Sequence, residues 1–347
     1  IRDSSTARGL GDVYKRQASS NVSARHCATR NRYHPRMPSA SASRSPATLR
    51  AATAPAAPVL LDDDAVDSVI AWYDAHHRDL PWRRATASPW GVLVSEIMLQ
   101  QTPVVRVLPR WTAWMQRWPR PADLAQAGTA DVLRAWDTLG YPRRALRLQE
   151  CARAITAGHD GEVPRTEEAL RALPGIGEYT AAAVSAFAFA RRAVVVDTNV
   201  RRVVARAVRG CALPASSLTA AERSIAAAQV PEDRARSVAW NQAVMELGAL
   251  VCTARRPRCE ECPLAAGDCR WVAAGSPAAD PSAQRRVQRF EGTDRQMRGR
   301  IMKILRTQGR ATDADLLRLD PEDPDRVERC ARSLVCLLYT SDAADDM

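Results

Sequence analysis

The feature that most constrains the fold is a short turn with two glycines, at residues 173–177, between two helical segments. The first segment ends at Pro174, because proline cannot continue a helix, and Gly175 and Gly177 permit a tight turn before an Ala-rich helix. The pattern predicts a helix-hairpin-helix with unpaired backbone N–H groups at its tip. Such a tip can bind phosphate and contact a nucleic-acid backbone without reading its sequence. Taken alone, the pattern is equally typical of an ordinary helix connector.

Charge and cysteine content narrow the class of protein. The 347 residues carry a formal net charge of +11, most of it from arginine, which favours an anionic partner, nucleic acid before membrane. No apolar run approaches the length of a transmembrane helix. Nine cysteines are too few and too unevenly placed for a disulfide scaffold, so a reducing compartment is expected. The length suffices for two domains.

The two ends of the chain differ from the rest in composition. Residues 1–60 are mostly rich in Ala, Ser, Arg and Pro, lack apolar periodicity and are predicted to be disordered. The first methionine is Met37. Our hypothesis is that Ile1–Gln17 and Cys336–Met347 are translated adaptor sequence and not native protein, which resequencing of the gene would test. A transit peptide is the alternative at the N-terminus, although two early aspartates disfavour it.

One carboxyl stands out in an otherwise apolar helix. Ser88 followed by Pro89 begins this helix in the preferred order of cap and proline, and residues 90–102 are apolar on nearly every side. Glu96 and Gln100, one turn apart, could form a narrow solvated stripe. Alternatively, Glu96 lines a pocket in which desolvation raises its pKa, so that it donates a proton near neutral pH.

Further helices are expected at roughly 105–118, 130–138 and 143–157 from their apolar spacing. Between the last two, the turn at residues 139–142 presents Tyr141. Tyr141 is either an ordinary surface residue or an aromatic that wedges into a stack of DNA bases.

A second carboxyl follows a run of valines at residues 194–196. The run has strand propensity, but it is short and has no partner strands, so a buried extended connector is predicted. Helical spacing resumes at Val200, which makes Asp197 or Thr198 the N-cap. Asp197 is either a plain cap or a carboxylate that the helix N-terminus keeps ionised to face a developing cation.

Four cysteines within eighteen residues indicate a metal site. Cys252, Cys259, Cys262 and Cys269 are separated by six, two and six residues. Zinc sites commonly pair two Cys-x-x-Cys knuckles, and only one is present, so an iron-sulfur cluster fits the wide, uneven loop better. Three arginines inside the first loop are expected to face a phosphate backbone.

From about Val66 to Trp271 the chain resembles the helix-hairpin-helix DNA glycosylases with a [4Fe-4S] cluster, the endonuclease III superfamily. Within it, the chain is most similar to the MutY-type adenine DNA glycosylases. Six motifs in family order carry the resemblance, at residues 80–83, 95–102, 139–141, 173–177 and 196–202 and at the four cysteines. The last cysteine loop departs from the family pattern, with six residues where five are usual.

The resemblance implies an all-α fold of two helical domains with DNA in the cleft between them. A six-helix domain at 82–191 would carry the hairpin, and an iron-sulfur domain would combine 61–81 with 192–275. Residues 276–347 are then a short C-terminal tail with a helical pattern, followed by a candidate winged-helix fragment. The further C-terminal domain with which many relatives recognise 8-oxoguanine is not expected here, which leaves the preference for 8-oxoguanine over guanine open.

The resemblance also implies a reaction, hydrolysis of the N-glycosidic bond of an adenine mispaired with 8-oxoguanine or guanine and flipped out of the duplex. Glu96 would protonate the adenine, and Asp197 would stabilise the oxocarbenium-like sugar, with or without a covalent adduct. Tyr179 and Asn199 would support them in the pocket. Tyr179 occupies the position of the lysine nucleophile of bifunctional relatives, and a phenol cannot form an imine, so a monofunctional glycosylase is predicted.

The remaining assignments also follow from the resemblance. The residues expected to contact DNA are Arg83, Gln101, Thr102, Tyr141, Gly175 and Gly177, and the four cysteines would hold a [4Fe-4S] cluster. The partner is double-stranded DNA with an adenine mismatch, bound by a monomer in the bacterial cytoplasm at the nucleoid, with no membrane. The alternatives are a thymine-mismatch or oxidised-pyrimidine glycosylase on the same scaffold, and a non-catalytic DNA-binding module.

Overall fold

The structure is a computed structural model that describes residues 59–279 and 290–342, with side chains described up to residue 335. The N-terminal segment expected to be disordered lies outside these ranges except for its last two residues, and Ile1–Gln17 lies wholly outside them. Cys336–Asp342 continue the last helix, and the final five residues lie outside the description. No helix in the described ranges is long and apolar enough to cross a membrane.

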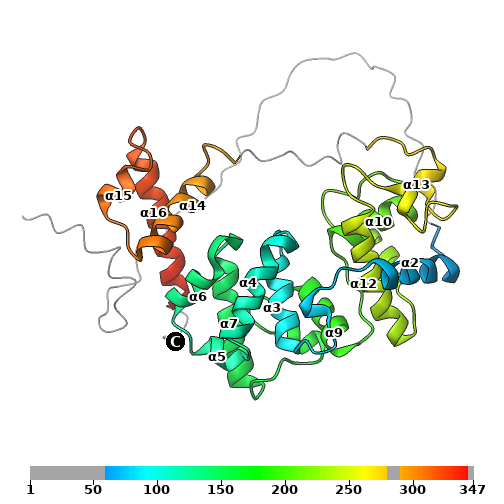
Figure 1. The fold of residues 1–347 in the computed structure, drawn as a ribbon, viewed down its shortest axis with the longest axis horizontal. Helices are drawn as coiled ribbons and strands as arrows, with labels where there is room; N and C mark the ends of the chain where they lie inside the picture. Colours follow the sequence, from blue (N-terminus) through cyan, green and yellow to red (C-terminus); the bar gives the residue numbers. More distant parts are fainter. Residues whose placement is uncertain (1–58, 280–289, 343–347) are drawn as a thin grey trace, which may run out of the picture.

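Three groups of helices lie in a row, with no strand among the described residues (Figure 1). The all-α prediction is therefore confirmed. A middle group is flanked at one end by a group that carries the cysteine loop and at the other end by the C-terminal helices. Each group has its own apolar core.

The middle group is built around a core that includes the fully buried Leu93, Met98, Trp114 and Trp136. Its elements are η1 (Pro81–Arg83), α3 (Pro89–Leu99), α4 (Val104–Arg117), α5 (Pro121–Ala125), α6 (Thr129–Trp136), η2 (Asp137–Leu139), α7 (Arg143–Gly158), α8 (Glu167–Arg171) and α9 (Glu178–Phe189). Seven α-helices are found in this fully described stretch, among them the five-residue α5, which begins at Pro121.

The helix-hairpin-helix consists of α8, the glycine turn and α9, as predicted. Gly175 has a φ of +77°, and a Cβ added there would lie 2.9 Å from the Cβ of Arg147. Only glycine fits such a position, since other residues rarely adopt a positive φ and a side chain would collide with Arg147. The turn thus fixes the approach of α9 to α3, on which it packs.

The second group joins two distant parts of the chain around one core. Helix α2 (Asp63–His76) packs on α12 (Arg234–Leu250), and the group is completed by α10 (Thr198–Ala207), α11 (Ala220–Ala228), η3 (Cys259–Glu261) and α13 (Arg270–Ala273). The valines at 194–196 form an irregular extended connector, as expected. We propose, from the separate cores, that 82–191 is one domain and that 61–81 with 192–275 is the other.

A buried carboxylate ties the two groups together. Glu246 of α12 has a fully buried side chain, which accepts from the Nε of Arg78 at 2.7 Å and from the Nη2 of Arg83 at 2.9 Å. Burial opposes ionisation of Glu246, but these donors lower its pKa to about 2. The link between α2 and η1 is therefore anchored to α12.

The C-terminal group is a three-helix unit with a core of its own. Helices α14 (Asp294–Gln308), α15 (Asp313–Leu317) and α16 (Pro324–Asp342) surround Met297, Ile301 and Leu305, which confirms most of the helical pattern expected there. The strands that would complete a winged helix are not found among the described residues.

Candidate active site

A cleft between the middle group and the cysteine-loop group collects all of the predicted catalytic and DNA-contact residues except Tyr141. Its volume is about 950 Å³, at the upper end of small-molecule sites and roomy enough for an extruded nucleotide. Its walls come from the C-terminal half of α3, the hairpin and the N-terminus of α10. Among the predicted residues that line it are Glu96, Tyr179, Asp197, Asn199, Arg83, Gln101, Thr102, Gly175 and Gly177.

Glu96 is buried in the α3 wall. Its side chain accepts a hydrogen bond from the Oη of Tyr179 at 2.9 Å, and the residue is 6% exposed, so the solvated-stripe alternative is wrong. Burial raises the pKa of Glu96 to about 7, against the lowering effects of the Tyr179 hydrogen bond and of Arg83. The like charge of Asp197 raises the pKa of Glu96 further, so the two carboxyls interact electrostatically. Glu96 can therefore hold or release a proton near neutral pH.

Asp197 is the N-cap of α10 and is surrounded by donors. Its Oδ1 accepts from the backbone N–H groups of Asn199 at 2.8 Å and Val200 at 2.7 Å, and its Oδ2 accepts from the Nδ2 of Asn199 at 2.7 Å. Burial nevertheless raises the pKa of Asp197, while these donors and Arg202 lower it. Desolvation therefore opposes the ionisation that the helix N-terminus favours, and an ionised Asp197 that faces a developing cation stays a prediction.

Tyr179 begins the second hairpin helix and points its hydroxyl into the cleft toward Glu96. Burial raises the pKa of Tyr179 well above its ordinary value, and the nearby Glu96 and Asp197 add to the effect. The phenol therefore stays neutral and acts as a hydrogen-bond donor.

Arg144, which was not predicted as a site residue, hydrogen-bonds to several segments at one rim of the cleft. Its Nη1 donates to the carbonyls of Ile97 at 3.0 Å and Met98 at 3.1 Å, at the end of α3. Its Nη2 donates to the Oγ1 of Thr102 at 3.0 Å and to the carbonyl of Leu139 at 3.1 Å. A cation in the first turn of a helix is destabilised by the helix dipole. The position of Arg144 in the first turn of α7 was therefore a signal in the sequence that its side chain has partners elsewhere.

Two residues expected to face DNA have a strained backbone. Gln101 has a φ of +56° and Tyr141 a φ of +51°, in the region that favours glycine. Gln101 lines the cleft. Tyr141 does not: the residue is 42% exposed, and the Cζ atoms of Arg144 and Arg295 are 5.6 and 4.7 Å from its ring centroid. The insertion of Tyr141 into a base stack stays a prediction.

Arg83 lines the cleft but is largely engaged by the protein. Its Nη2 donates to Glu246, while its Nη1 is buried with no hydrogen-bond partner among the described residues. The buried Nη1 is available to donate a hydrogen bond to an acceptor on a ligand, and a DNA contact by Arg83 stays a prediction.

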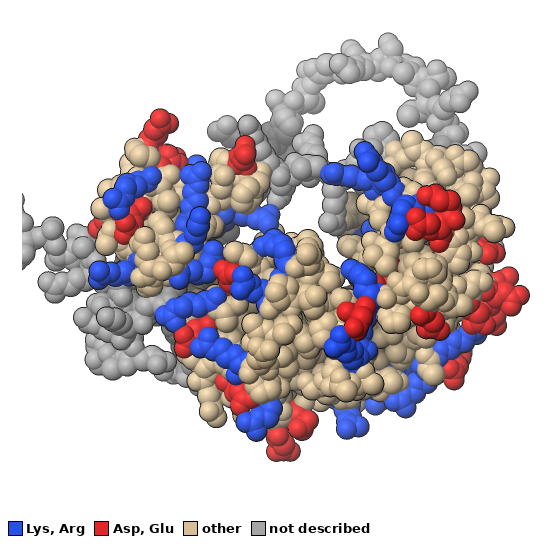
Figure 2. Space-filling model, viewed as in Figure 1, with Lys and Arg blue, Asp and Glu red and all other residues tan. Residues whose placement is uncertain are grey.

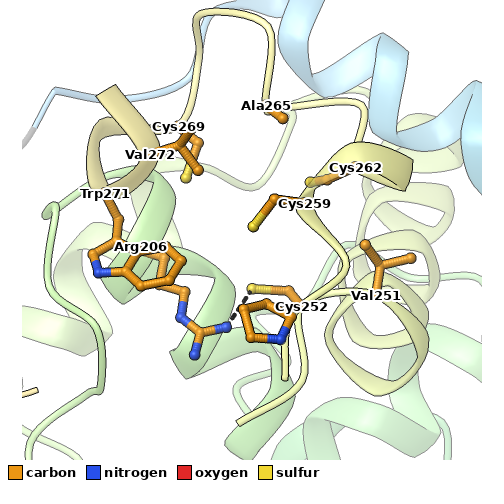
Figure 3. Close-up of a pocket in the computed structure, with 10 residues that line it drawn as sticks. Arg206, Val251, Cys252, Cys259, Cys262, Ala265, Cys269, Trp271 and Val272 are labelled. Atoms are coloured by element: carbon orange, nitrogen blue, oxygen red, sulfur yellow. Dashed lines mark hydrogen bonds between the residues drawn. The ribbon is translucent and has the colours of Figure 1, made fainter. Parts of the chain in front are cut away.

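The four predicted ligand cysteines surround a small cavity together with Arg206 and Trp271 (Figure 3). No three His, Cys, Asp or Glu side chains in the described ranges are close enough to hold a single metal ion. A zinc site needs all four sulfurs at about 2.3 Å from one ion. Thiols spread around a cavity fit a cluster better, so the donor set fits an iron-sulfur group.

Two arginines of α10 that were not predicted as site residues, the buried Arg206 and the half-buried Arg202, contact the cysteine loop. Arg206 donates to the Sγ of Cys252 at 3.3 Å and stacks on Trp271, with its Cζ 4.7 Å from the ring centroid. Arg202 donates to the backbone carbonyl of Cys252 at 2.5 Å and to the Oδ1 of Asn199 at 2.8 Å. Since Asn199 in turn binds Asp197, the loop position is coupled to the α10 wall of the cleft.

The sequence matches two family descriptions that agree with this geometry. Residues 94–223 match the HhH-GPD superfamily of base excision DNA repair proteins, and residues 252–269 match the iron-sulfur binding domain of endonuclease III. Fold and site thus define a helix-hairpin-helix base excision repair protein with an iron-sulfur domain.

Curated relatives narrow this class. An adenine DNA glycosylase of Mycolicibacterium smegmatis is 55% identical over 239 residues, which cover 69% of this chain and 79% of that protein. An adenine DNA glycosylase of Mycobacterium tuberculosis is 53% identical over 239 residues, 69% and 77% of the two chains. The human adenine DNA glycosylase is 45% identical over 205 residues, 57% of this chain and 37% of that one. The chain belongs to the adenine DNA glycosylase family of base excision repair.

Solved structures support the fold. A thermostable thymine-DNA glycosylase superposes with a TM-score of 0.53 and 28% identity, covering 60% of this chain and 95% of that one. An endonuclease III trapped in a covalent DNA complex superposes with a TM-score of 0.52 and 22% identity, covering 62% and 96%, which shows the fold alone.

Proposed function

We propose that this protein is a monofunctional glycosylase that hydrolyses the N-glycosidic bond of an adenine mispaired with 8-oxoguanine or guanine in duplex DNA. The observation that carries the proposal is the buried Glu96, whose pKa of about 7 lets it act as an acid near neutral pH, in one cleft with Asp197.

The first step is protonation of the base. The extruded adenine enters the cleft, and Glu96 gives its proton to a nitrogen of the five-membered ring, so that the base leaves as a neutral molecule. The Tyr179 hydroxyl orients the Glu96 carboxyl through the 2.9 Å hydrogen bond and also stabilises the carboxylate that remains after proton transfer.

The second step is stabilisation of the sugar. As the bond between C1′ and the base breaks, positive charge develops on the deoxyribose, and the Asp197 carboxylate lies on the α10 wall to oppose it. Burial raises the pKa of Asp197 in the empty cleft, but a cation beside it lowers the pKa. The charge is therefore best stabilised at the moment when it is needed. Water then adds to C1′ and gives a proton to the Glu96 carboxylate, which yields the abasic site and restores the acid form of Glu96 after the neutral adenine has left.

The strand stays intact in this reaction. The hairpin position at which a lysine would form an imine with the sugar holds Tyr179, whose phenol cannot do so. We propose that strand cleavage requires later treatment with alkali.

Cys252, Cys259, Cys262 and Cys269 would hold a [4Fe-4S] cluster, which supplies a redox-active iron centre and closes the loop. The protein's part is to fix that loop, through Arg206 on the Cys252 sulfur and Arg202 on the Cys252 carbonyl. We propose that the protein works as a monomer on duplex DNA in the bacterial cytoplasm, at the nucleoid.

The test is a panel of duplexes that contain A opposite 8-oxoguanine, A opposite G, T opposite G, or a damaged pyrimidine, with abasic sites scored before and after alkali. We expect cleavage of the two adenine duplexes alone, and only after alkali. Excision of thymine or a damaged pyrimidine would replace the proposal by the same-scaffold alternative. Strand scission without alkali would overturn the monofunctional assignment, and no excision at all would leave only a DNA-binding module.

A further inference from the structure

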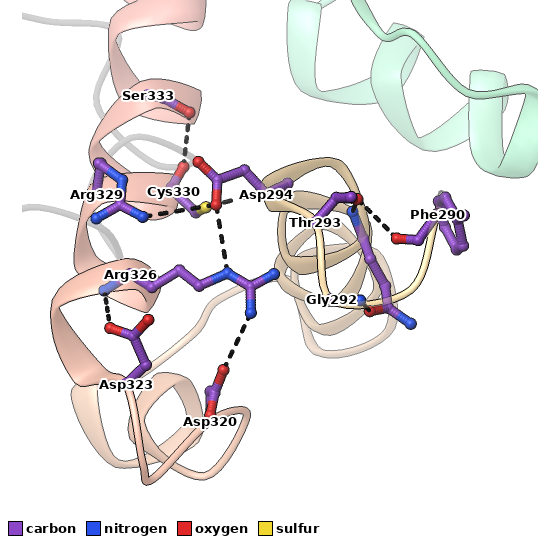
Figure 4. A network of polar contacts seen from close by, with 11 residues as sticks. Phe290, Gly292, Thr293, Asp294, Asp320, Asp323, Arg326, Arg329, Cys330 and Ser333 are labelled. Atoms are coloured by element: carbon purple, nitrogen blue, oxygen red, sulfur yellow. Dashed lines mark hydrogen bonds and ion pairs between the residues drawn. The ribbon is translucent and has the colours of Figure 1, made fainter. Parts of the chain in front are cut away.

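In the C-terminal group (residues 290–335), cations that are paired with acids and cations that are not lie in different parts of the unit. Four arginines of the unit, three in α16 and one at the C-cap of α15, are paired with acids: Arg326 with Asp294 and Asp320, Arg329 with Asp294, Arg318 with Asp315 and Arg332 with Glu328. Figure 4 shows how Arg326 and Arg329 converge on Asp294, which holds the start of α14 against α16. These cations serve the unit itself and are balanced within it.

The outward side of α14 is different, because it carries cations and no acid. At about 100° per residue, Arg295, Arg300, Lys303 and Arg306 fall within a sector of roughly 140° of the helix, together with the uncharged Gln296, Gly299 and Thr307. The core residues Met297, Ile301 and Leu305 lie outside this sector. Arg295, Arg300 and Lys303 are exposed and have no acidic partner within 4.0 Å in the described part of the chain. We call these four residues the α14 basic face.

The α14 basic face adjoins the middle group at the turn that bears Tyr141. Arg306 donates its Nη1 to the carbonyl of Asp137 at 3.3 Å and pairs with the Asp137 carboxylate at 3.6 Å. The guanidinium of Arg295 covers the Tyr141 ring at 4.7 Å. Figure 2 shows Lys and Arg side chains gathered on the C-terminal group and along its border with the middle group.

We propose that the α14 basic face binds the phosphate backbone of duplex DNA beside the cleft and so extends the contact area past Tyr141; this inference rests on the proposed duplex substrate. The face is about 16 Å long from Arg295 to Arg306, which matches roughly five phosphates along one strand at about 3.4 Å of helix axis per phosphate. Three cations without an acidic partner in the described part of the chain favour a polyanion. The contacts of Arg295 with Tyr141 and of Arg306 with Asp137 fix the face relative to the turn.

The experiment measures binding of the full chain to an undamaged duplex as a function of salt concentration. The variant Arg300→Ala/Lys303→Ala removes the two cations of the face that do not touch the middle group. We expect weaker binding and a slope of log K against log salt that is smaller by about 1 for each lost contact. The matched control is Arg318→Ala/Arg332→Ala, which makes the same change in net charge on exposed side chains of the same unit.

The control separates local contact from overall charge, because charges beyond about 8 Å are largely screened at physiological salt. Wild-type slopes for the control, and a restored slope for the charge-conserving Arg300→Lys/Lys303→Arg, support the proposal. An unchanged slope for Arg300→Ala/Lys303→Ala, or the same loss in the control, overturns it. Thermal unfolding of each variant confirms that the unit is folded. Since an undamaged duplex needs no excision, failure here is distinguishable from failure of the adenine glycosylase assignment.

Discussion

Both walls of the cleft desolvate a carboxyl, with Glu96 buried and Asp197 half-buried, but they surround the two carboxyls differently. On the α3 wall, Glu96 sits in an apolar helix with one donor, the Tyr179 hydroxyl. On the α10 wall, Asp197 receives three N–H donors from a helix N-terminus, two from Asn199 and one from Val200. Burial raises the pKa of both carboxyls. The donors around Asp197 favour the charged form, and the apolar surroundings of Glu96 favour the neutral form.

The difference shows that burial alone does not assign an acid and a base. Desolvation raises the pKa of both carboxyls. The number and kind of hydrogen-bond donors therefore decide which carboxyl acts as the acid and which as the charged group. Substitutions that remove one group at a time test this asymmetry, and we expect the largest loss of excision rate from the change at Glu96.

Glu96→Gln removes the proton donor but keeps the shape of the α3 wall. We expect a loss of about 10²–10⁴-fold in the single-turnover excision rate, the usual range for general acid catalysis. Binding to the same duplex should remain within a few-fold, because the amide still fills the cavity. Gel-based excision and fluorescence anisotropy on one A·8-oxoguanine duplex measure both quantities. Turnover at the wild-type rate would remove Glu96 from the proposed role.

Asp197→Asn removes the charge on the α10 wall while keeping the N-cap. Asparagine caps helices as well as aspartate does, so the melting temperature should change little. The excision rate should fall by about 10²–10³-fold, the usual cost of losing a preorganised electrostatic group. The control is Asp233→Asn, at the N-cap of α12. An Asp197→Asn protein that excises normally would mean that Asp197 is only a cap.

Gly248→Ala tests how the α10 wall is held. A Cβ at this position of α12 would lie 2.6 Å from the Cβ of Asn199 and 2.9 Å from the backbone carbonyl oxygen of Asn199. Overpacking of this kind costs about 1–3 kcal/mol of unfolding free energy. Because Asn199 is bonded to Asp197, we expect excision to slow by roughly 10-fold or more, as misplaced catalytic groups do. Gly158→Ala is the control, with open space around the added Cβ, and equal effects in the two variants would argue against this coupling.

The sequence predicted the local features of both walls. The cap before α10, the odd carboxyl in α3 and the glycine turn depend on neighbouring residues, and the structure contains all three. The cysteine loop was found for the same reason, since its ligand spacing is local. The family resemblance then placed these elements around one cleft.

The long-range contacts could not be predicted in this way. Arg144 reaches the end of α3 from a helix more than 40 residues away, and Glu246 meets Arg78 and Arg83 across more than 160 residues. Nothing in the spacing of the sequence marks such partners, because they depend on how the groups of helices pack. The burial that raises the pKa of Asp197 could not be predicted for a similar reason: burial is set by the whole fold, whereas the cap is local.

Tyr179→Phe has the smallest expected effect and addresses the single donor on the α3 wall. The active form of Glu96 is protonated, so in the wild type the excision rate should fall about tenfold per pH unit above the Glu96 pKa of about 7. The Tyr179 hydrogen bond lowers this pKa, and its removal therefore raises the pKa and moves the descending limb to higher pH. Single-turnover rates between roughly pH 5 and 9 measure the shift.

The control for this shift is Tyr73→Phe, which removes a hydroxyl that bonds Gln242 and does not line the cleft. Its descending limb should coincide with that of the wild type. A limb that moves to lower pH in Tyr179→Phe would mean that the phenol stabilises the neutral acid more than the carboxylate. The contrast between the two walls would then depend on the apolar packing of α3 alone.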